Sequence, residues 1–249
     1  MPTTQPAARR TPLLLLVLAC TIAGCAHPTA RPAPSAGVHI VDRPVPFPPE
    51  RVALTREYIR QHYGLDVPDI RIVPRIIVLH WTAVATFQGS YNAFVHTTLS
   101  ADRTELARAG DVNVSIQFLV DRDGTIYRLM PETWMARHVI GINYNSIGVE
   151  NVGGAGGATD LTAAQVQANV SLVLYLAHKY PTIRYLIGHY EYRDFEGHPL
   201  WLERDSTYRT PKIDPGPGFM AAVRAGVADL HLEGPAEIQR EKAAAKRPQ

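Results

Sequence analysis

Cysteine is almost absent from this sequence of 249 residues. Only Cys20 and Cys25 occur, and both lie within the first 25 residues. The remainder of the chain cannot form an internal disulfide, although such bonds are common in exported proteins. A folded domain after Cys25 must therefore be stabilised by its core or by a metal. The apolar fraction of 46% is enough for one domain with tails.

An excess of basic charge is also missing. Removing Arg9 and Arg10 from the 25 Lys and Arg residues leaves 23 basic residues, which equals the number of Asp and Glu residues. This balance gives no support for a nucleic-acid partner. The sequence contains no internal repeat either, and we expect a monomer.

The sequence lacks an apolar run long enough to span a bilayer. The longest early run, residues 13–19, follows the two arginines and is typical of a signal peptide. It is followed by Ile22-Ala23-Gly24-Cys25, which resembles the bacterial lipobox. The resemblance implies that residues 1–24 are removed and that Cys25 is acylated, so the membrane is a partner. The alternative is an ordinary secretory signal with an incidental cysteine.

The residue after Cys25 also bears on location. Ala26 is not the aspartate type of retention signal, which favours the outer membrane of the cell envelope, facing the periplasm. Seven prolines in residues 26–50 predict a linker, so we assign residues 25–54 to the lipidated cysteine and linker. The domain is expected over 55–231. The charged, Ala/Lys-rich residues 232–249 are expected to be disordered.

Strand and helix patterns alternate within the domain. Apolar strands are predicted over 75–80, 114–120, 125–130, 146–150 and 185–189, with a hairpin turn at Asp123-Gly124. A capping box, Thr162 to Gln165, begins the clearest helix, residues 163–179, and a closing helix is predicted over 219–230. The pattern predicts an α/β (α+β) domain with a central mixed sheet flanked by helices.

Three of these strands end in a titratable residue: His80, Glu150 and His189. Lys212 and Asp214 follow in an irregular loop rich in proline, and they point to the same side if that loop is extended. Two histidines and one carboxylate form a usual catalytic zinc shell, and a further carboxylate can act as base. Each residue alone is more often structural, and the loop charges could simply be solvated. No compact HExxH motif is present.

Five segments together resemble the zinc-dependent N-acetylmuramoyl-L-alanine amidases of the type 2 family, which are related in fold to peptidoglycan recognition proteins. They occur in the family's order and cover about residues 75–220: Ile77 to Thr82, Val120 to Met130, Ser146 to Glu150, Ile187 to His189, and Lys212 to Gly216.

The resemblance implies a role for each matching residue. His80, His189 and Asp214 match the zinc ligands, Glu150 matches the general base, and Lys212 matches the residue that stabilises the oxyanion. Two positions depart from the family pattern. Gln117 stands where members often carry His, and Arg137-His138 replaces a common Trp-His pair. Neither position is an expected ligand, and the departures concern only the expected substrate contacts near that pair.

The resemblance implies a lipid-anchored enzyme that hydrolyses the bond between N-acetylmuramic acid and L-alanine in peptidoglycan or its fragments. Two alternatives remain open. One is a non-catalytic peptidoglycan-binding lipoprotein on the same fold, although binding-only relatives have usually lost a ligand. The other is an adaptor with structural zinc, which a closed ligand shell would favour.

Overall fold

The computed structural model describes residue 1 and residues 37–100, 106 and 108–245. Residues 2–24 of the expected signal peptide, Cys25 and part of the expected linker lie outside the described residues. Among the described residues, no helix has both the length and the apolar character needed to cross a membrane.

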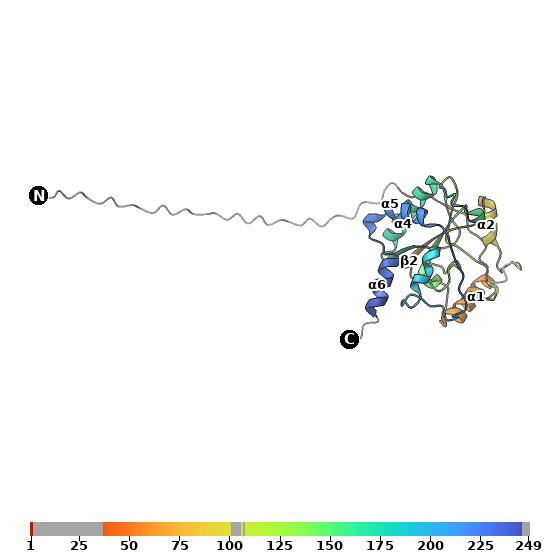
Figure 1. Ribbon diagram of the computed structural model, residues 1–249. Helices are drawn as coiled ribbons and strands as arrows, with labels where there is room; N and C mark the ends of the chain where they lie inside the picture. Colours follow the sequence, from red (N-terminus) through yellow and green to blue (C-terminus); the bar gives the residue numbers. More distant parts are fainter. Residues whose placement is uncertain (2–36, 101–105, 107, 246–249) are drawn as a thin grey trace. The chain divides into compact units, whose positions relative to one another are not determined.

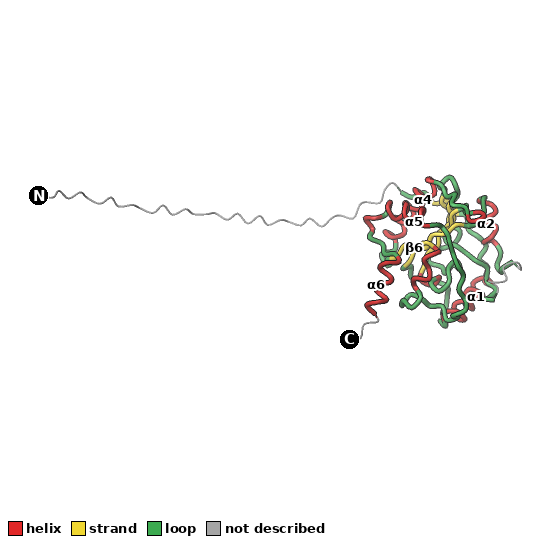
Figure 2. The backbone as a smooth tube through the Cα atoms, in the orientation of Figure 1, coloured by secondary structure: helices red, strands yellow, loops and turns green. Residues whose placement is uncertain are grey.

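Six strands form one mixed sheet in the order β1-β4-β3-β5-β2-β6. Strand β2 pairs in parallel with both β5 and β6, while β3 and β4 form an antiparallel pair. Figure 2 shows the strands in yellow, with red helices and green loops around them. The mixed sheet confirms the predicted fold class. The strands are β1 Ile40–Asp42, β2 Ile76–Trp81, β3 Phe118–Val120, β4 Ile126–Arg128, β5 Ser146–Asn151 and β6 Tyr185–Gly188.

Along the chain, the helices come between and after these strands, and Figure 1 labels the α-helices. The predicted helix over 163–179 is confirmed with its capping box, in which the backbone N–H groups and side-chain oxygens of Thr162 and Gln165 bond reciprocally. The helices are α1 Pro49–Tyr58, α2 Phe87–Val95, α4 Ala163–Lys179, α5 Pro217–Gly226 and α6 Pro235–Ala245. Shorter helices of the 3-10 or π type are η1 Ile59–Tyr63, η2 Asn143–Asn145, η3 Ala155–Gly157, η4 His189–Phe195 and η5 Ala228–Leu230.

The two faces of the sheet have different coverings. Ile77 and Leu79 of β2 pack in a core cluster with α4 and α5. Ile76 and Val78 point the other way and pack in a second cluster with η4 and α6. Because side chains alternate along a strand, His80 shares the face of Val78. The alternation of side chains along β2 therefore directs this histidine toward the side of the sheet covered by η4.

The hairpin between β3 and β4 forms at the predicted place with a different turn. Of its two central residues, only Gly124 has a positive φ, 89°. The Asp121 carbonyl accepts from the Gly124 N–H at 2.9 Å, and the Asp121 N–H donates to Thr125 O at 2.9 Å. These two hydrogen bonds enclose a loop that is longer than the predicted two-residue turn. The Asp123 carboxylate accepts from the Thr125 N–H, which holds the loop in that shape.

The N-terminal boundary predicted at residue 55 is wrong. Strand β1 pairs in parallel with β4, and α1 begins at Pro49, so the domain includes residues that the proline content had assigned to a linker. Pro49 is a helix-starting residue here because the first helical position needs no N–H donor. Arg51 of α1 is fully buried and donates to the carbonyls of Phe94 and Val114.

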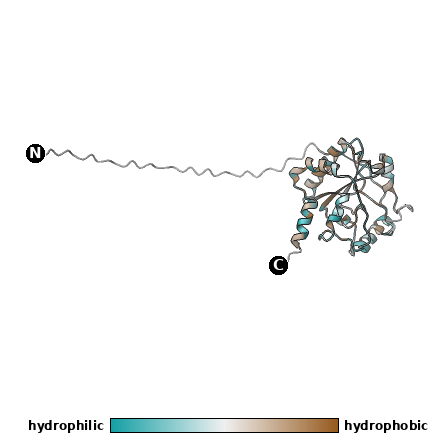
Figure 3. Cartoon of the chain, in the orientation of Figure 1, coloured by the Kyte–Doolittle hydropathy of each residue, from teal (hydrophilic) through white to brown (hydrophobic). Residues whose placement is uncertain are grey.

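The prediction of a disordered tail over 232–249 is wrong for residues 235–245, which form α6. The side chain of Ile238 is fully buried in the cluster on the η4 face. Glu241 accepts from the Tyr185 hydroxyl at 2.6 Å and lies 2.9 Å from His198 Nε2. The helix is coloured both brown and teal in Figure 3, as expected for one that is buried on one side.

Candidate metal and active site

His80 lies near the end of β2, and α4 fixes its backbone through two asparagines. Its carbonyl accepts from the Asn151 side-chain amide at 3.0 Å. The Asn151 side-chain oxygen in turn accepts from Asn169 of α4 at 2.7 Å. Because all three residues are buried, these bonds hold the strand end in one position.

His189 follows β6 directly and opens η4. The Gly188 N–H donates to the Glu191 carboxylate at 2.8 Å, and Arg224 of α5 donates to the same carboxylate. The next residue ties this turn to the loop before α5, because the Tyr190 N–H donates to the carbonyl of Asp214 at 3.0 Å. One backbone hydrogen bond therefore brings His189 and Asp214 side by side.

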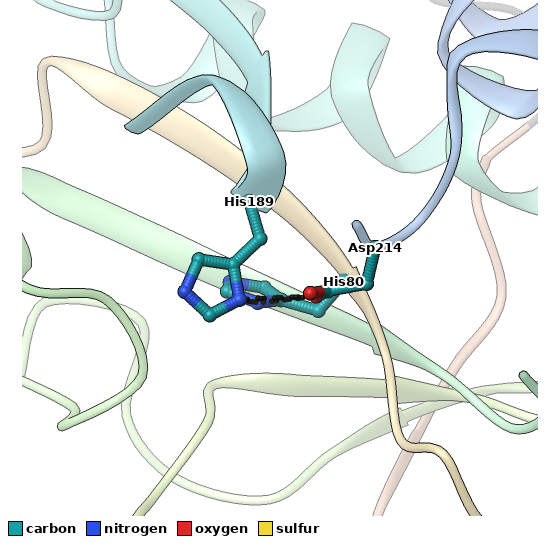
Figure 4. Close-up of side chains that lie close together, drawn as sticks. All are labelled: His80, His189 and Asp214. Carbon is teal, nitrogen blue, oxygen red and sulfur yellow. Dashed lines mark hydrogen bonds and ion pairs between the residues drawn. The ribbon is translucent and has the colours of Figure 1, made fainter. Parts of the chain in front are cut away.

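The three expected metal ligands converge from three different segments (Figure 4). The Nδ1 atoms of His80 and His189 lie 2.9 Å apart. The Asp214 Oδ2 atom lies 3.0 Å from His189 Nδ1 and 3.4 Å from His80 Nδ1. All three residues are buried, with exposed fractions of 1%, 7% and 7% for His80, His189 and Asp214.

The protonation states suit metal binding. Burial lowers the pKa of His80 and lowers that of His189 to about 4, although the Asp214 carboxylate opposes both shifts. Burial alone would raise the pKa of Asp214, but the neighbouring histidines outweigh it and hold that pKa below its usual range. Metal ligation requires neutral imidazoles and an ionised carboxylate.

The distances within the triangle formed by His80 Nδ1, His189 Nδ1 and Asp214 Oδ2 also fit zinc. Ligand atoms at usual zinc distances in a tetrahedral site lie about 3.3 Å from one another. The three observed separations of 2.9, 3.0 and 3.4 Å are close to this value. The donor set of two imidazoles and one carboxylate is one that zinc takes in catalytic sites. The residues present therefore fit a zinc ion.

Glu150 and Lys212 face the same space as these ligands. In the parallel pair of β2 and β5, Glu150 lies opposite His80, so its side chain shares the face of His80. A cavity of about 260 Å³ is lined by both residues together with His189 and Asp214. The structure therefore brings together all five residues that the sequence singled out, while their roles remain predictions.

His138 is a site residue whose position the sequence did not reveal. Its Nδ1 lies 2.9 Å from Nε2 of His80, whereas the other two expected ligands lie near Nδ1 of that ring. The only signal was its place in the pair that departs from the family pattern. Arg137, the other member, is 3% exposed and donates to the carbonyls of Leu106, Gly110 and Val112.

The remaining departure has a structural explanation. Gln117 is fully buried, accepts from the Gly148 N–H and donates to the carbonyl of Trp134. Two aromatic residues of the stretch between β6 and α5 pack against each other. Tyr192 is 1% exposed and stacks on Trp201 with ring centroids 6.1 Å apart.

A family model, Amidase_2, described as N-acetylmuramoyl-L-alanine amidase, matches residues 71–217. This span covers more than half of the chain and contains the whole site. The chain belongs to this family. The family predicted from five short segments is thereby confirmed, while the zinc and the lipid anchor stay predictions. The protein is an enzyme of the N-acetylmuramoyl-L-alanine amidase class.

Solved structures of similar amidases exist, whereas no curated protein matches the chain. The endolysin LysCS from Clostridium intestinale is 24% identical, with 63% of this chain and 86% of that chain covered and a TM-score of 0.41. A selenomethionine AmpD derivative is 23% identical, with 76% and 94% covered and a TM-score of 0.46. AmiD from E. coli, solved with its substrate, is 20% identical, with 68% and 61% covered and a TM-score of 0.42. At these values the family assignment of this amidase rests on the family model.

Proposed function

We propose that this amidase is a zinc enzyme that hydrolyses the amide bond between N-acetylmuramic acid and L-alanine in peptidoglycan or its fragments. The observation that carries the proposal is the triangle of His80, His189 and Asp214 beside a cavity that Glu150 and Lys212 also line. Zinc, when bound by these three ligands, supplies Lewis-acid polarisation of the scissile carbonyl and lowers the pKa of a water molecule.

Glu150 is the general base in this proposal. Its carboxylate accepts a proton from the attacking water, whose oxygen forms a bond to the carbonyl carbon of the muramic acid lactyl group. The carbon–nitrogen bond then breaks, and Glu150 returns the proton to the alanine nitrogen, which leaves as an amine. Its position opposite His80 on the adjacent strand supports this role.

Lys212 stabilises the negative charge that develops on the carbonyl oxygen. Its side chain lines the cavity, and its positive charge acts on the imidazoles of both His80 and His189. A fixed cation near the reacting carbonyl lowers the barrier most where water is partly excluded. The half-buried position of Lys212 supports this role.

A catalytic site is favoured over a purely structural zinc site by the number of ligands. Within the described residues, the gathered donor set consists of three side chains rather than four. Catalytic sites keep one position for water or substrate, whereas structural sites are closed by protein. The non-catalytic binding module is disfavoured because all three ligand positions are occupied by residues that can bind metal.

The proposed cellular setting is the bacterial envelope. Export, acylation of Cys25 and anchoring to the outer membrane, with the domain facing the periplasm, are supported by the N-terminal sequence. This location would place the amidase next to its proposed partners, peptidoglycan and its muropeptides.

Zinc content tests the ligand set. Wild-type protein should hold about one zinc per chain by elemental analysis, and His189→Ala should lose most of that zinc together with the amidase activity. His178→Ala, which removes an exposed histidine of α4, is the matched control and should keep both. A His189→Ala protein with full zinc content would contradict the proposed site.

A further inference from the structure

A second line of side chains runs from His80 away from the proposed metal. Nε2 of His80 lies 2.9 Å from Nδ1 of His138. On the far side of that ring, Nε2 of His138 lies 3.3 Å from the Ser146 hydroxyl, which donates to the carbonyl of Ile142 at 3.0 Å. The line therefore has three side chains and ends on a backbone carbonyl.

The direction of every hydrogen bond in this line follows from one condition. A metal at the triangle needs the lone pair of His80 Nδ1, so the proton of this neutral ring must be on Nε2. That proton is donated to Nδ1 of His138, whose own proton is then on Nε2 and is donated to Ser146. The Ser146 proton goes to the Ile142 carbonyl, which can only accept.

The fold holds the His138 ring in place for this contact. The backbone N–H groups of His138 and Val139 both donate to the side-chain oxygen of Asn143, at 2.9 and 2.8 Å. The rings of His80 and His138 are nearly perpendicular, with an interplanar angle of 85°. A Cβ atom at Gly148 would lie only 2.8 Å from Nδ1 of His138, so the glycine leaves room for the ring.

We propose that His138 is a positioning residue that selects the metal-binding tautomer of His80 and fixes the orientation of its ring. The inference rests on the zinc site of the proposed function and concerns a residue outside its ligand set. Groups that accept a hydrogen bond from a metal-ligating histidine increase metal affinity, and removing them typically weakens it about 10- to 100-fold.

Three variants at position 138 separate hydrogen bonding from packing. His138→Ala removes both the ring and the acceptor. His138→Phe keeps an aromatic ring without an acceptor, and His138→Asn keeps an acceptor oxygen near the place of Nδ1 without the ring. Zinc affinity is measured by competition with a chelator of known affinity, on proteins whose fold is checked by circular dichroism.

His138→Ala and His138→Phe should bind zinc about 10- to 100-fold more weakly than wild type, and His138→Asn should recover most of the loss. Ser146→Ala changes a residue that touches neither His80 nor the metal, and it should weaken zinc binding by a smaller factor. It is the test variant to use if His138→Ala does not fold. Equal zinc affinity of His138→Ala and wild type, or recovery of the affinity by His138→Phe rather than by His138→Asn, would overturn the inference. A wild-type protein without zinc would instead overturn the proposed metal site, and the inference with it.

Discussion

At the scale of single residues, the site depends on the alternation of side chains along β2 and on the register in which β2 and β5 pair. His80 stands two residues after Val78 and so shares its face of the sheet. Glu150 lies opposite His80 because β2 and β5 pair in parallel. A shift of one residue in either strand would turn one of these side chains to the opposite face, against α4 and α5.

Glu150→Gln tests the proposed base. Glutamine keeps the shape of the side chain but cannot accept a proton as a carboxylate does, so the amidase rate should fall by about 10²–10⁴-fold. Zinc content should stay near the wild-type value, because Glu150 is outside the ligand triangle. Rate and zinc are measured on the same preparation. Loss of zinc would make Glu150 a ligand, and an undiminished rate would remove it from the mechanism.

The residues of the proposed ligand set could be singled out from the sequence because strand ends are local features. His80 and His189 each follow an apolar run, and Asp214 lies in a loop marked by prolines. The contact of His138 could not be predicted in the same way. It joins two residues that are 58 positions apart and depends on how the segment before β5 folds over the sheet, where Gly148 leaves room for the ring and Asn143 holds the backbone.

At the scale of elements, α6 shows that packing against the domain can make a polar segment helical rather than disordered. Its residues Ala, Glu, Gln, Arg and Lys are strong helix formers, and Pro235 precedes them, so a helix signal was present. Composition alone indicated disorder because Ile238 is its single large apolar residue. The pocket that takes Ile238 is built by distant residues of β6 and η4, which no local pattern reveals.

Ile238→Ala should lower the free energy of unfolding by about 2–5 kcal/mol, because a fully buried side chain leaves a cavity. Thermal unfolding should show a melting temperature several degrees below wild type. Arg240→Ala, on the exposed side of the same helix, is the control and should change stability by about 0.5 kcal/mol or less. Equal melting temperatures for Ile238→Ala and wild type would mean that α6 does not contribute to the fold.

At the scale of the whole molecule, we propose separate tasks for the domain and the N-terminal segment. The amidase domain carries the five site residues, and the proposed acylation of Cys25 would hold it at a membrane. A single acyl chain binds a membrane only weakly, whereas several chains on one residue give stable attachment. The family could be predicted from the sequence because its five short segments lie in order along one chain.

Cys25→Ala should abolish acylation and move the protein from the membrane fraction to the soluble fraction. Amidase activity of the released protein on soluble substrate should remain at the wild-type level, because Cys25 precedes the folded domain. Fractionation of cells followed by mass analysis of the N-terminus provides the measurement. Unchanged membrane association, with no lipid on the wild type, would exclude the anchor.

The most direct test of the central claim is mass analysis of the products formed from purified sacculi and from soluble muropeptides. The proposed activity predicts stem peptides with a free L-alanine amino group, and muramic acid residues with a free lactyl carboxylate. Cleavage should stop when zinc is removed with a chelator and should resume when zinc is restored. Cleavage at another bond, or cleavage unaffected by the removal of zinc, would contradict the account.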